Sequence, residues 1–167
     1  MDIVHQITGL VLSGLVLFAG CGDAARFTIP NWPAIAIVAL FPLAALLAGM
    51  GWAEAGNHLL AGVLALLFAM ALFAPGWIGG GDGKLFAATA LWFGWPGVIV
   101  MLIHTALVGG VLVVMLLLLR HVLPMLGISP EKLAGTALAP GAPVPYGIAI
   151  AGGVVWSLPA TAFAISL

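Results

Sequence analysis

Long apolar segments separated by short polar ones follow one another along almost the whole chain. About 20 apolar residues are needed to cross the roughly 30 Å hydrocarbon core of a bilayer. Three segments meet this requirement, and two more do so if Pro42 and Pro159 only bend them. The pattern predicts membrane helices over residues 3–20, 34–50, 57–74, 98–119 and 146–167.

A sixth segment, residues 85–95, is too short to be assigned by length. At 1.5 Å per residue it spans about 16 Å, or about 21 Å if the helix begins at Asp82. The bias of basic residues toward the cytoplasmic side of membrane helices decides the question. With six crossings and an outside amino terminus, all basic residues fall on one side, and Asp2 and Glu54 on the other. Those basic residues are Arg26, Lys84, Arg120 and Lys132.

The sequence therefore predicts an all-α, polytopic membrane protein with about six transmembrane helices, the amino terminus outside and a single domain over residues 1–167. The short fourth helix should meet the fifth in a tight turn at residues 94–97. Cytoplasmic loops are predicted over residues 21–33, 75–84 and 120–145, with Ser129 capping a short helix in the last. Trp92 and three other tryptophans near predicted helix ends are typical of an interfacial aromatic belt.

The composition narrows the range of partners. Apolar residues make up 64% and charged residues 5% of the chain, against about 25% charged residues in soluble domains, and the mean hydropathy is +1.30. Four Lys and Arg residues cannot form the basic face that nucleic-acid binding needs. We therefore expect the lipid bilayer as a partner and no nucleic acid. Cys21 is the single cysteine and cannot form an internal disulfide or a cysteine metal site.

Two of the five acidic residues lie beside membrane helices on the same predicted face of the bilayer. Asp23 follows the first helix and Asp82 precedes the fourth. Two carboxylates a few Å apart tend to share one proton, so one can deprotonate water while the other donates to a scissile carbonyl. Such a pair titrates as a unit, which leaves the acid and base roles unassigned. An alternative that fits this placement equally well is that each aspartate merely marks a helix end.

The stretch IGGGDGKL surrounds Asp82 with glycines. Glycine permits backbone conformations and close approaches that other residues resist, which would let main-chain groups meet an extended peptide. The helix dipole also favours Asp82 at a helix amino terminus. A glycine cluster between two membrane helices can equally be a plain turn, and this one lacks the Lys-Ser or Lys-Thr ending of a phosphate loop.

Other polar residues have two interpretations. Arg26, three residues after Asp23, would share its helical face and favour the ionised aspartate, or would act only as a cytoplasmic anchor. Lys84 has the same two interpretations. Small residues four apart in the last helix, Gly147 and Ala151, predict close helix packing. Three histidines in or near helices are expected to be hydrogen-bonded packing residues, because no spacing here indicates a zinc site. They are His5, His58 and His104.

Three blocks of residues resemble the prepilin peptidases, which are membrane aspartic proteases with a Gly-x-Gly-Asp motif. The resemblance is to the short form associated with tight-adherence, or Flp-type, pili, which lacks the cysteine-tetrad domain of the larger relatives. Together the blocks and the six-helix layout cover essentially the whole chain. The blocks are DAARFTIPNW with Asp23, Ile29, Pro30 and Asn31, then GGGDGKL with Gly79, Gly81, Asp82 and Lys84, and finally PYGIAIAGG, which includes Tyr146.

The resemblance implies that Asp23 and Asp82 are the catalytic residues of a prepilin leader peptidase. Such an enzyme would cleave type IV or Flp-type prepilins or pseudopilins at the cytoplasmic face of the bacterial inner membrane, with water as the nucleophile and no metal or organic cofactor. The substrate would arrive laterally within the bilayer, because cleavage falls just before its hydrophobic helix. The same resemblance implies further substrate-binding or site-shaping residues, namely Gly79, Gly81, Lys84, Arg26, Pro30, Asn31 and Tyr146.

Two other classes of function are open at this point. Intramembrane carboxylates also line ion paths, so a small membrane transporter or proton-relay protein could use the same aspartates. That function calls for a carboxylate near mid-bilayer with broken helices facing it, whereas both aspartates are predicted at helix ends on one side. A purely structural assembly subunit would tolerate loss of both carboxylates.

Overall fold

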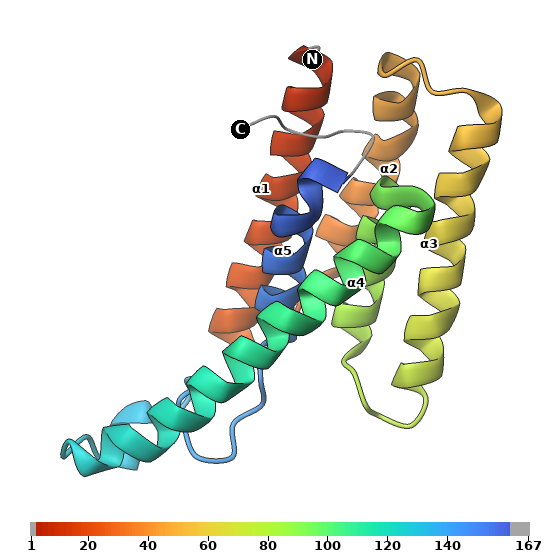
Figure 1. Cartoon of the computed structure of the whole chain (residues 1–167). Helices are drawn as coiled ribbons and strands as arrows, with labels where there is room; N and C mark the ends of the chain where they lie inside the picture. The colour runs from red at the N-terminus through yellow and green to blue at the C-terminus, as the bar shows by residue number, and fades with distance from the viewer. Residues whose placement is uncertain (1–2, 161–167) are drawn as a thin grey trace.

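The computed structural model describes residues 3–160 and contains helices but no strand in that range (Figure 1), which confirms the predicted all-α fold. The elements are α1 (Ile3–Arg26), α2 (Asn31–Leu47), α3 (Trp52–Phe73), α4 (Gly80–Met125), the 3₁₀ helix η1 (Pro130–Leu133), α5 (Tyr146–Ser157) and the 3₁₀ helix η2 (Leu158–Ala160). The last predicted membrane helix extends to residue 167, and its residues 161–167 lie outside the described part of the chain.

A sharp break divides α4 into a short and a long helix. Gly94 (φ 60°, ψ −175°) and Trp95 (φ −101°, ψ 124°) interrupt the helical backbone, and the Gly94 conformation is one that essentially only glycine adopts. The described residues therefore form six apolar helical segments with a short fourth one, as predicted. Three of these segments are long and apolar enough to cross a membrane, namely His5–Arg26, Trp52–Phe73 and Gly97–Met125.

Side chains of α3 stabilise this break by pairing with backbone carbonyl groups beside it. A helix end leaves carbonyl groups without intrahelical partners, and each unpaired group is costly in an apolar bundle. Nδ1 of His58 lies 2.8 Å from the carbonyl oxygen of Leu91, and Nδ2 of Asn57 donates to the carbonyl oxygen of Trp95 at 2.9 Å. His58 is buried and stacks on Phe41. The prediction that His58 is a hydrogen-bonded packing residue is confirmed.

The short half of α4 lies in the core of the bundle. Residues 85–93 are all buried, and α4 packs against α2, α3 and α5. Trp92 is 2% exposed, and its Nε1 donates to the carbonyl oxygen of Ile37 at 3.0 Å. The prediction of an interfacial Trp92 is therefore wrong, because its indole N–H finds a partner on α2 inside the bundle. Trp52 and Trp77, by contrast, are strongly exposed near helix ends.

Several helix boundaries differ from those predicted. α1 continues to Arg26 and α4 begins at Gly80, so the loops beside them are shorter than residues 21–33 and 75–84. A helix pairs the backbone groups of these polar stretches internally, which favours its continuation in an apolar environment. The predicted helix after Ser129 is the 3₁₀ helix η1, and the Ser129 side chain makes no capping hydrogen bond.

The long half of α4 extends past the predicted end at residue 119, to Met125. Its 29 residues correspond to about 43 Å, which exceeds the hydrocarbon thickness and favours a tilt. Figure 1 shows it running obliquely past α1 and α5.

Arg120 on this helix holds the following loop by donating to the carbonyl oxygens of Ala137, at 3.0 and 2.7 Å, and Ala142, at 2.8 Å. The loop thereby returns to the bundle, where α5 begins.

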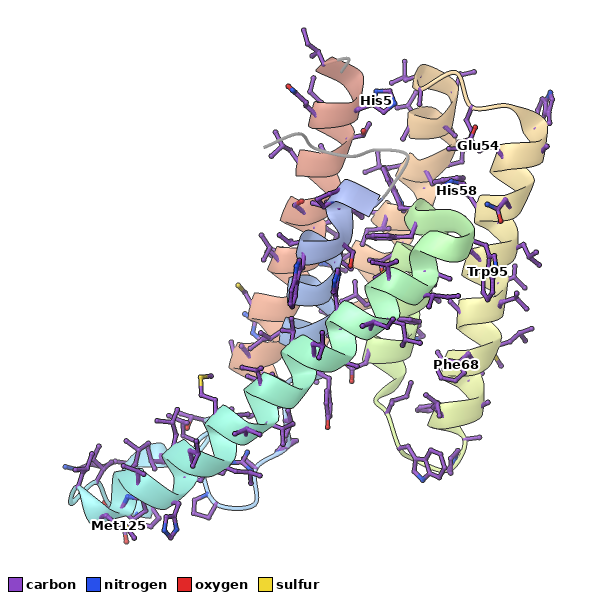
Figure 2. All side chains as sticks on the ribbon, viewed as in Figure 1. His5, Glu54, His58, Phe68, Trp95 and Met125 are labelled. Carbon is purple, nitrogen blue, oxygen red and sulfur yellow. The ribbon has the colours of Figure 1, made fainter. Side chains whose placement is uncertain are left out.

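Five helix ends gather at one end of the bundle. α1 and α3 end there, while α2, α4 and α5 begin there (Figure 1). Helix amino termini carry free N–H groups and a partial positive charge. This end of the bundle therefore offers hydrogen-bond donors to carboxylates, whereas Glu54 lies at the opposite end (Figure 2).

We expect Gly94→Ala to lower the stability of the fold by about 1–3 kcal/mol. An alanine strongly disfavours the φ of 60°, and its Cβ would lie 2.9 Å from the His58 ring. The measurement is the apparent melting temperature of the purified protein in detergent. Gly14→Ala, whose new Cβ would meet open space in α1, is the matched control and should melt close to the wild-type temperature. Equal melting temperatures for the two variants would contradict the role assigned to Gly94.

Candidate active site

Asp23 lies near the end of α1 and is held by the start of α5. The side chain is 6% exposed, and its Oδ2 accepts a hydrogen bond from the backbone N–H of Gly147 at 2.8 Å. Gly147 is the second residue of α5, so this N–H is one of the donors that have no partner within their own helix. A helix amino terminus also favours a negative charge beside it. The start of α5 therefore orients and stabilises one oxygen of the Asp23 carboxylate.

Glycine is required at position 147 by the closeness of this contact. A Cβ there would lie 2.8 Å from Cβ of Asp23 and 2.9 Å from Cδ1 of Ile29. The sequence predicted close packing at Gly147, and packing against α1 is confirmed: a Cβ on Gly20 would lie 2.9 Å from the Gly147 carbonyl oxygen. The donor role of the Gly147 N–H was missed, because spacing within one helix does not show which side chain of another helix meets its backbone.

Asp82 lies in the first turn of α4, where Gly79 is the N-cap residue. Oδ1 of Asp82 is buried and has no hydrogen-bond partner within residues 3–160. Asp82 is outside the three long candidate membrane spans. Burial raises the pKa of Asp82 to about 6, the nearby charge of Asp23 adds to the increase, and the backbone N–H of Gly79 opposes it. The two carboxylates are thus within electrostatic reach of each other.

The glycines around Asp82 allow close approach, and none of Gly79, Gly80, Gly81 and Gly83 has a positive φ. The part of the prediction that relied on unusual backbone conformations is therefore wrong, since the chain is already helical from Gly80. A Cβ on Gly79 would lie 2.7 Å from Oδ2 of Asp82. A Cβ on Gly81 would lie 3.0 Å from Cβ of Ile29, in the segment that follows Asp23. Glycine here leaves room for the Asp82 carboxylate and lets the start of α4 approach Ile29 closely.

Other predicted site residues lie at helix ends at the same end of the bundle as the two aspartates. Nζ of Lys84 donates to Oδ1 of Asn31 at 3.0 Å, which links the start of α4 to the start of α2. Pro30 is the N-cap residue of α2. Arg26 is exposed in the last turn of α1, whereas Asp23 is buried. The structure therefore joins Lys84 and Asn31 to each other and leaves the Arg26 side chain at the surface.

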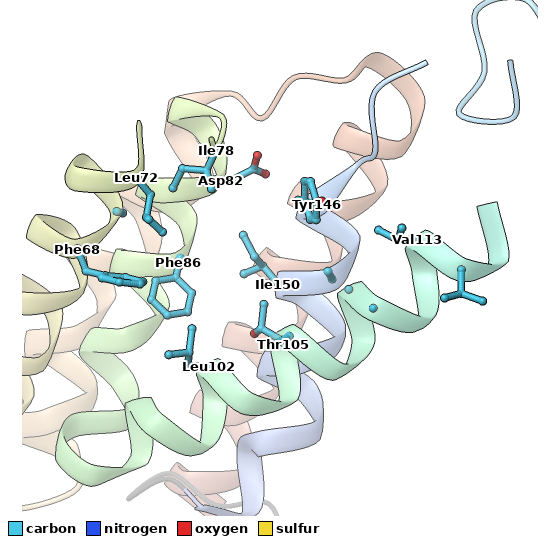
Figure 3. A pocket seen from close by; sticks show the side chains of 16 residues that line it. Phe68, Leu72, Ile78, Asp82, Phe86, Leu102, Thr105, Val113, Tyr146 and Ile150 are labelled. Atoms are coloured by element: carbon cyan, nitrogen blue, oxygen red, sulfur yellow. The ribbon is translucent and has the colours of Figure 1, made fainter. Parts of the chain in front are cut away.

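An apolar groove of about 520 Å³ opens beside Asp82 between α3, α4 and α5. Figure 3 shows Asp82 and Tyr146 on opposite sides of it, with Phe86, Leu102 and Ile150 further along. Asp82 lines this groove, whereas Asp23 is not among the lining residues and is held by the start of α5. An apolar segment in the groove would thus present its polar end to a carboxylate that has a second carboxylate nearby.

Within residues 3–160, no group of three His, Cys, Asp or Glu side chains lies close enough to hold a metal ion. The candidate site therefore consists of the two carboxylates and the groove beside Asp82. Their arrangement can hold and transfer a proton, because one oxygen of Asp23 is fixed by an amide while Asp82 has an unpaired oxygen.

Comparison with known proteins identifies one family. The sequence profile of the type IV leader peptidase family matches residues 10–114, more than half of the chain. The matched region contains Asp23 and Asp82 and ends before α5 begins. Neither a curated protein nor a solved structure gives a significant match.

The raised pKa of Asp82 predicts a pH-dependent stability. The folded protein binds this proton more tightly than the unfolded chain, in which an aspartate has its ordinary pKa of 3.8. The stabilising contribution of the protonated carboxyl is therefore full below about pH 4 and is lost as the pH rises toward about 6. Melting temperatures of the wild type and Asp82→Asn should diverge in favour of the variant between these pH values.

The control for this experiment is Glu131→Gln, which removes an exposed carboxylate from η1. Its melting temperature should follow that of the wild type at every pH. A constant difference between the wild type and Asp82→Asn across the range would show that Asp82 has an ordinary pKa.

Proposed function

Because the chain belongs to the type IV leader peptidase family, we propose that it is a membrane aspartic endopeptidase in which Asp23 and Asp82 form the catalytic dyad. The substrates are type IV or Flp-type prepilins or pseudopilins, from which it removes the leader. The observation that carries this proposal is the pair itself: two carboxylates at one end of an apolar bundle, one buried and one lining a groove, with the charge of one raising the pKa of the other.

Catalysis by the pair follows from its shared proton. In the reactive state one carboxyl is protonated and the other ionised, because two adjacent negative charges are costly at a partly buried site. The ionised member takes a proton from water, and the resulting nucleophile attacks the scissile carbonyl carbon. The protonated member donates to the carbonyl oxygen as negative charge develops there. The two aspartates act as a unit, and the Gly147 N–H keeps one of them in place.

The apolar groove gives the substrate a route to the pair. A prepilin has a hydrophobic helix directly after its leader, and such a helix can lie along apolar walls while its polar end meets Asp82. Tyr146 stands across the groove from Asp82 and can contact the peptide near the cleavage point. Entry from the side keeps the hydrophobic helix of the substrate in lipid throughout, so no apolar surface has to be exposed to water.

The distribution of charge supports a cytoplasmic active site in a bacterial inner membrane. Arg26 and Lys84 lie at the same end of the bundle as the two aspartates, and Glu54 lies at the other end. Basic residues beside membrane helices favour the cytoplasmic side. The leader of a prepilin would then be cut at the cytoplasmic face while the hydrophobic helix of the substrate is still in the membrane.

We expect Asp23→Asn and Asp82→Asn each to reduce leader cleavage at least about 100-fold, the usual scale for losing a general acid or base. An amide cannot accept the proton from water, and it leaves the remaining carboxylate without a partner. The measurement is the conversion of a co-expressed Flp-type prepilin to its mature form, followed by immunoblot in a host without its own leader peptidase. Membrane levels of each variant are measured in parallel.

Glu54→Gln is the matched control, since it removes an exposed carboxylate at the far end of the bundle. This variant should cleave at the wild-type rate. Near-normal cleavage by either aspartate variant, at normal membrane levels, would overturn the dyad. Substrate-independent proton flux through the reconstituted wild type, lost in both aspartate variants, would instead favour the transporter or proton-relay alternative.

A separate prediction concerns the amide that holds Asp23. Gly147→Ala should lower cleavage about tenfold or more, because a hydrogen bond to a charged group contributes about 1.5–3 kcal/mol and the new Cβ would displace Asp23. Gly22→Ala, next to Asp23 but with open space around the added Cβ, should retain wild-type cleavage. Equal rates for these two variants would show that the contact with Gly147 does not position Asp23.

A further inference from the structure

A second groove, which we call the lysine groove, lies on the other side of the short half of α4. It has a volume of about 680 Å³ and runs between α2, α3 and α4. Lys84, Ala88 and Leu91 line it at helical spacing, whereas Asp82 and Phe86 line the first groove. Since residues four apart share a helix face, the short half of α4 separates the two grooves. A peptide positioned at Asp82 therefore does not occupy the lysine groove.

The lysine groove is polar at one end only. Lys84 and Asn31 lie at the starts of their helices, at the same end of the bundle as the two aspartates, and all other residues lining the groove are apolar. Nζ of Lys84 donates to Oδ1 of Asn31, and in the described part of the chain the ammonium has no carboxylate partner. The bond to a neutral amide leaves its positive charge uncompensated. A single positive charge at the end of an apolar groove complements a ligand with an anionic head and an apolar tail.

The length of the groove shows whether a lipid acyl chain or a membrane-spanning helix fits it better. Its walls reach from Lys84 to Leu91 on α4 and from Asn31 to Ala39 on α2, which correspond to about 10 and 12 Å along the helix axes. One leaflet of the bilayer has a hydrocarbon depth of about 15 Å, and a membrane-spanning helix needs about twice that. The groove therefore matches the acyl chain of a lipid in one leaflet and is too short for a spanning helix.

We propose that the lysine groove binds an anionic phospholipid, with the phosphate on Lys84 and Asn31 and one acyl chain along the groove. Nζ of Lys84 supplies the charge. Nδ2 of Asn31 supplies a second donor, because Oδ1 of that amide already accepts from Lys84. Basic pockets between membrane helices are a recurrent form of headgroup site on the cytoplasmic side. Lys84 is two residues from Asp82, so the bound lipid lies across the short half of α4 from the proposed catalytic pair.

The test measures lipid retention by the full-length protein purified in a neutral detergent, using native mass spectrometry with phosphatidylglycerol or phosphatidylcholine added. Proteolysis plays no part in the readout. The wild type should retain phosphatidylglycerol about fivefold better than phosphatidylcholine, the scale of one basic residue at an anionic lipid surface. Lys84→Gln should abolish this preference. Lys132→Gln, which removes an exposed lysine from η1, should keep it.

A second variant tests the apolar part of the groove. Ala39 is exposed on its wall, so Ala39→Trp should fill it and reduce retention of both lipids without disturbing the core.

Equal retention of the two lipids by the wild type, or unchanged retention in Lys84→Gln, would overturn the proposal. Displacement of phosphatidylglycerol by millimolar inorganic phosphate would also overturn it, because the site would then bind phosphate alone. A Lys84→Gln variant that keeps its lipid preference but loses prepilin binding would assign Lys84 to the substrate.

Discussion

The hydrogen bond from the Gly147 N–H to Oδ2 of Asp23 joins residues 124 positions apart and links α5 to α1. A carboxylate at the end of an apolar helix is costly to bury unless a donor compensates it. The free N–H groups at the start of α5 provide that donor, so α5 has to begin beside the end of α1. Arg120 supports this arrangement from a distance, because it holds the loop that leads to α5.

The break at Gly94 is the second constraint. It ends the helix that begins at Gly80 after only a short run of residues. A helix that starts at Gly80 and ends at the break is too short to cross a membrane comfortably. It is therefore packed into the core, where α3 pairs the carbonyl groups that the break exposes. Because this short helix is central, one of its faces presents Asp82 to the first groove while another presents Lys84 to the second. The chemistry of the site and the proposed lipid contact both depend on this one element.

Hydropathy and charge together predict six helices, including the short fourth one, because the position of Arg120 and Lys132 requires an extra crossing. The same topology predicts that Asp23 and Asp82 lie at one end of the bundle. Contacts between distant helices are not encoded in such patterns, so the role of the Gly147 N–H and the burial of Trp92 against Ile37 are evident only in the folded structure. The glycines near Asp82 were rightly connected with close approach and wrongly with unusual backbone conformations, because a GGDG sequence is compatible with either a loop or a helix start.

Asp23 and Asp82 should titrate as one pair, and infrared spectroscopy with isotope-labelled aspartate can detect this coupling. The absorption of the protonated Asp82 carboxyl, identified by its loss in Asp82→Asn, should disappear as the pH rises through about 6. In Asp23→Asn the midpoint of this change should move to lower pH, because the neighbouring negative charge that raises the pKa of Asp82 is gone. An unchanged midpoint in Asp23→Asn would contradict the pair and leave two independent carboxylates.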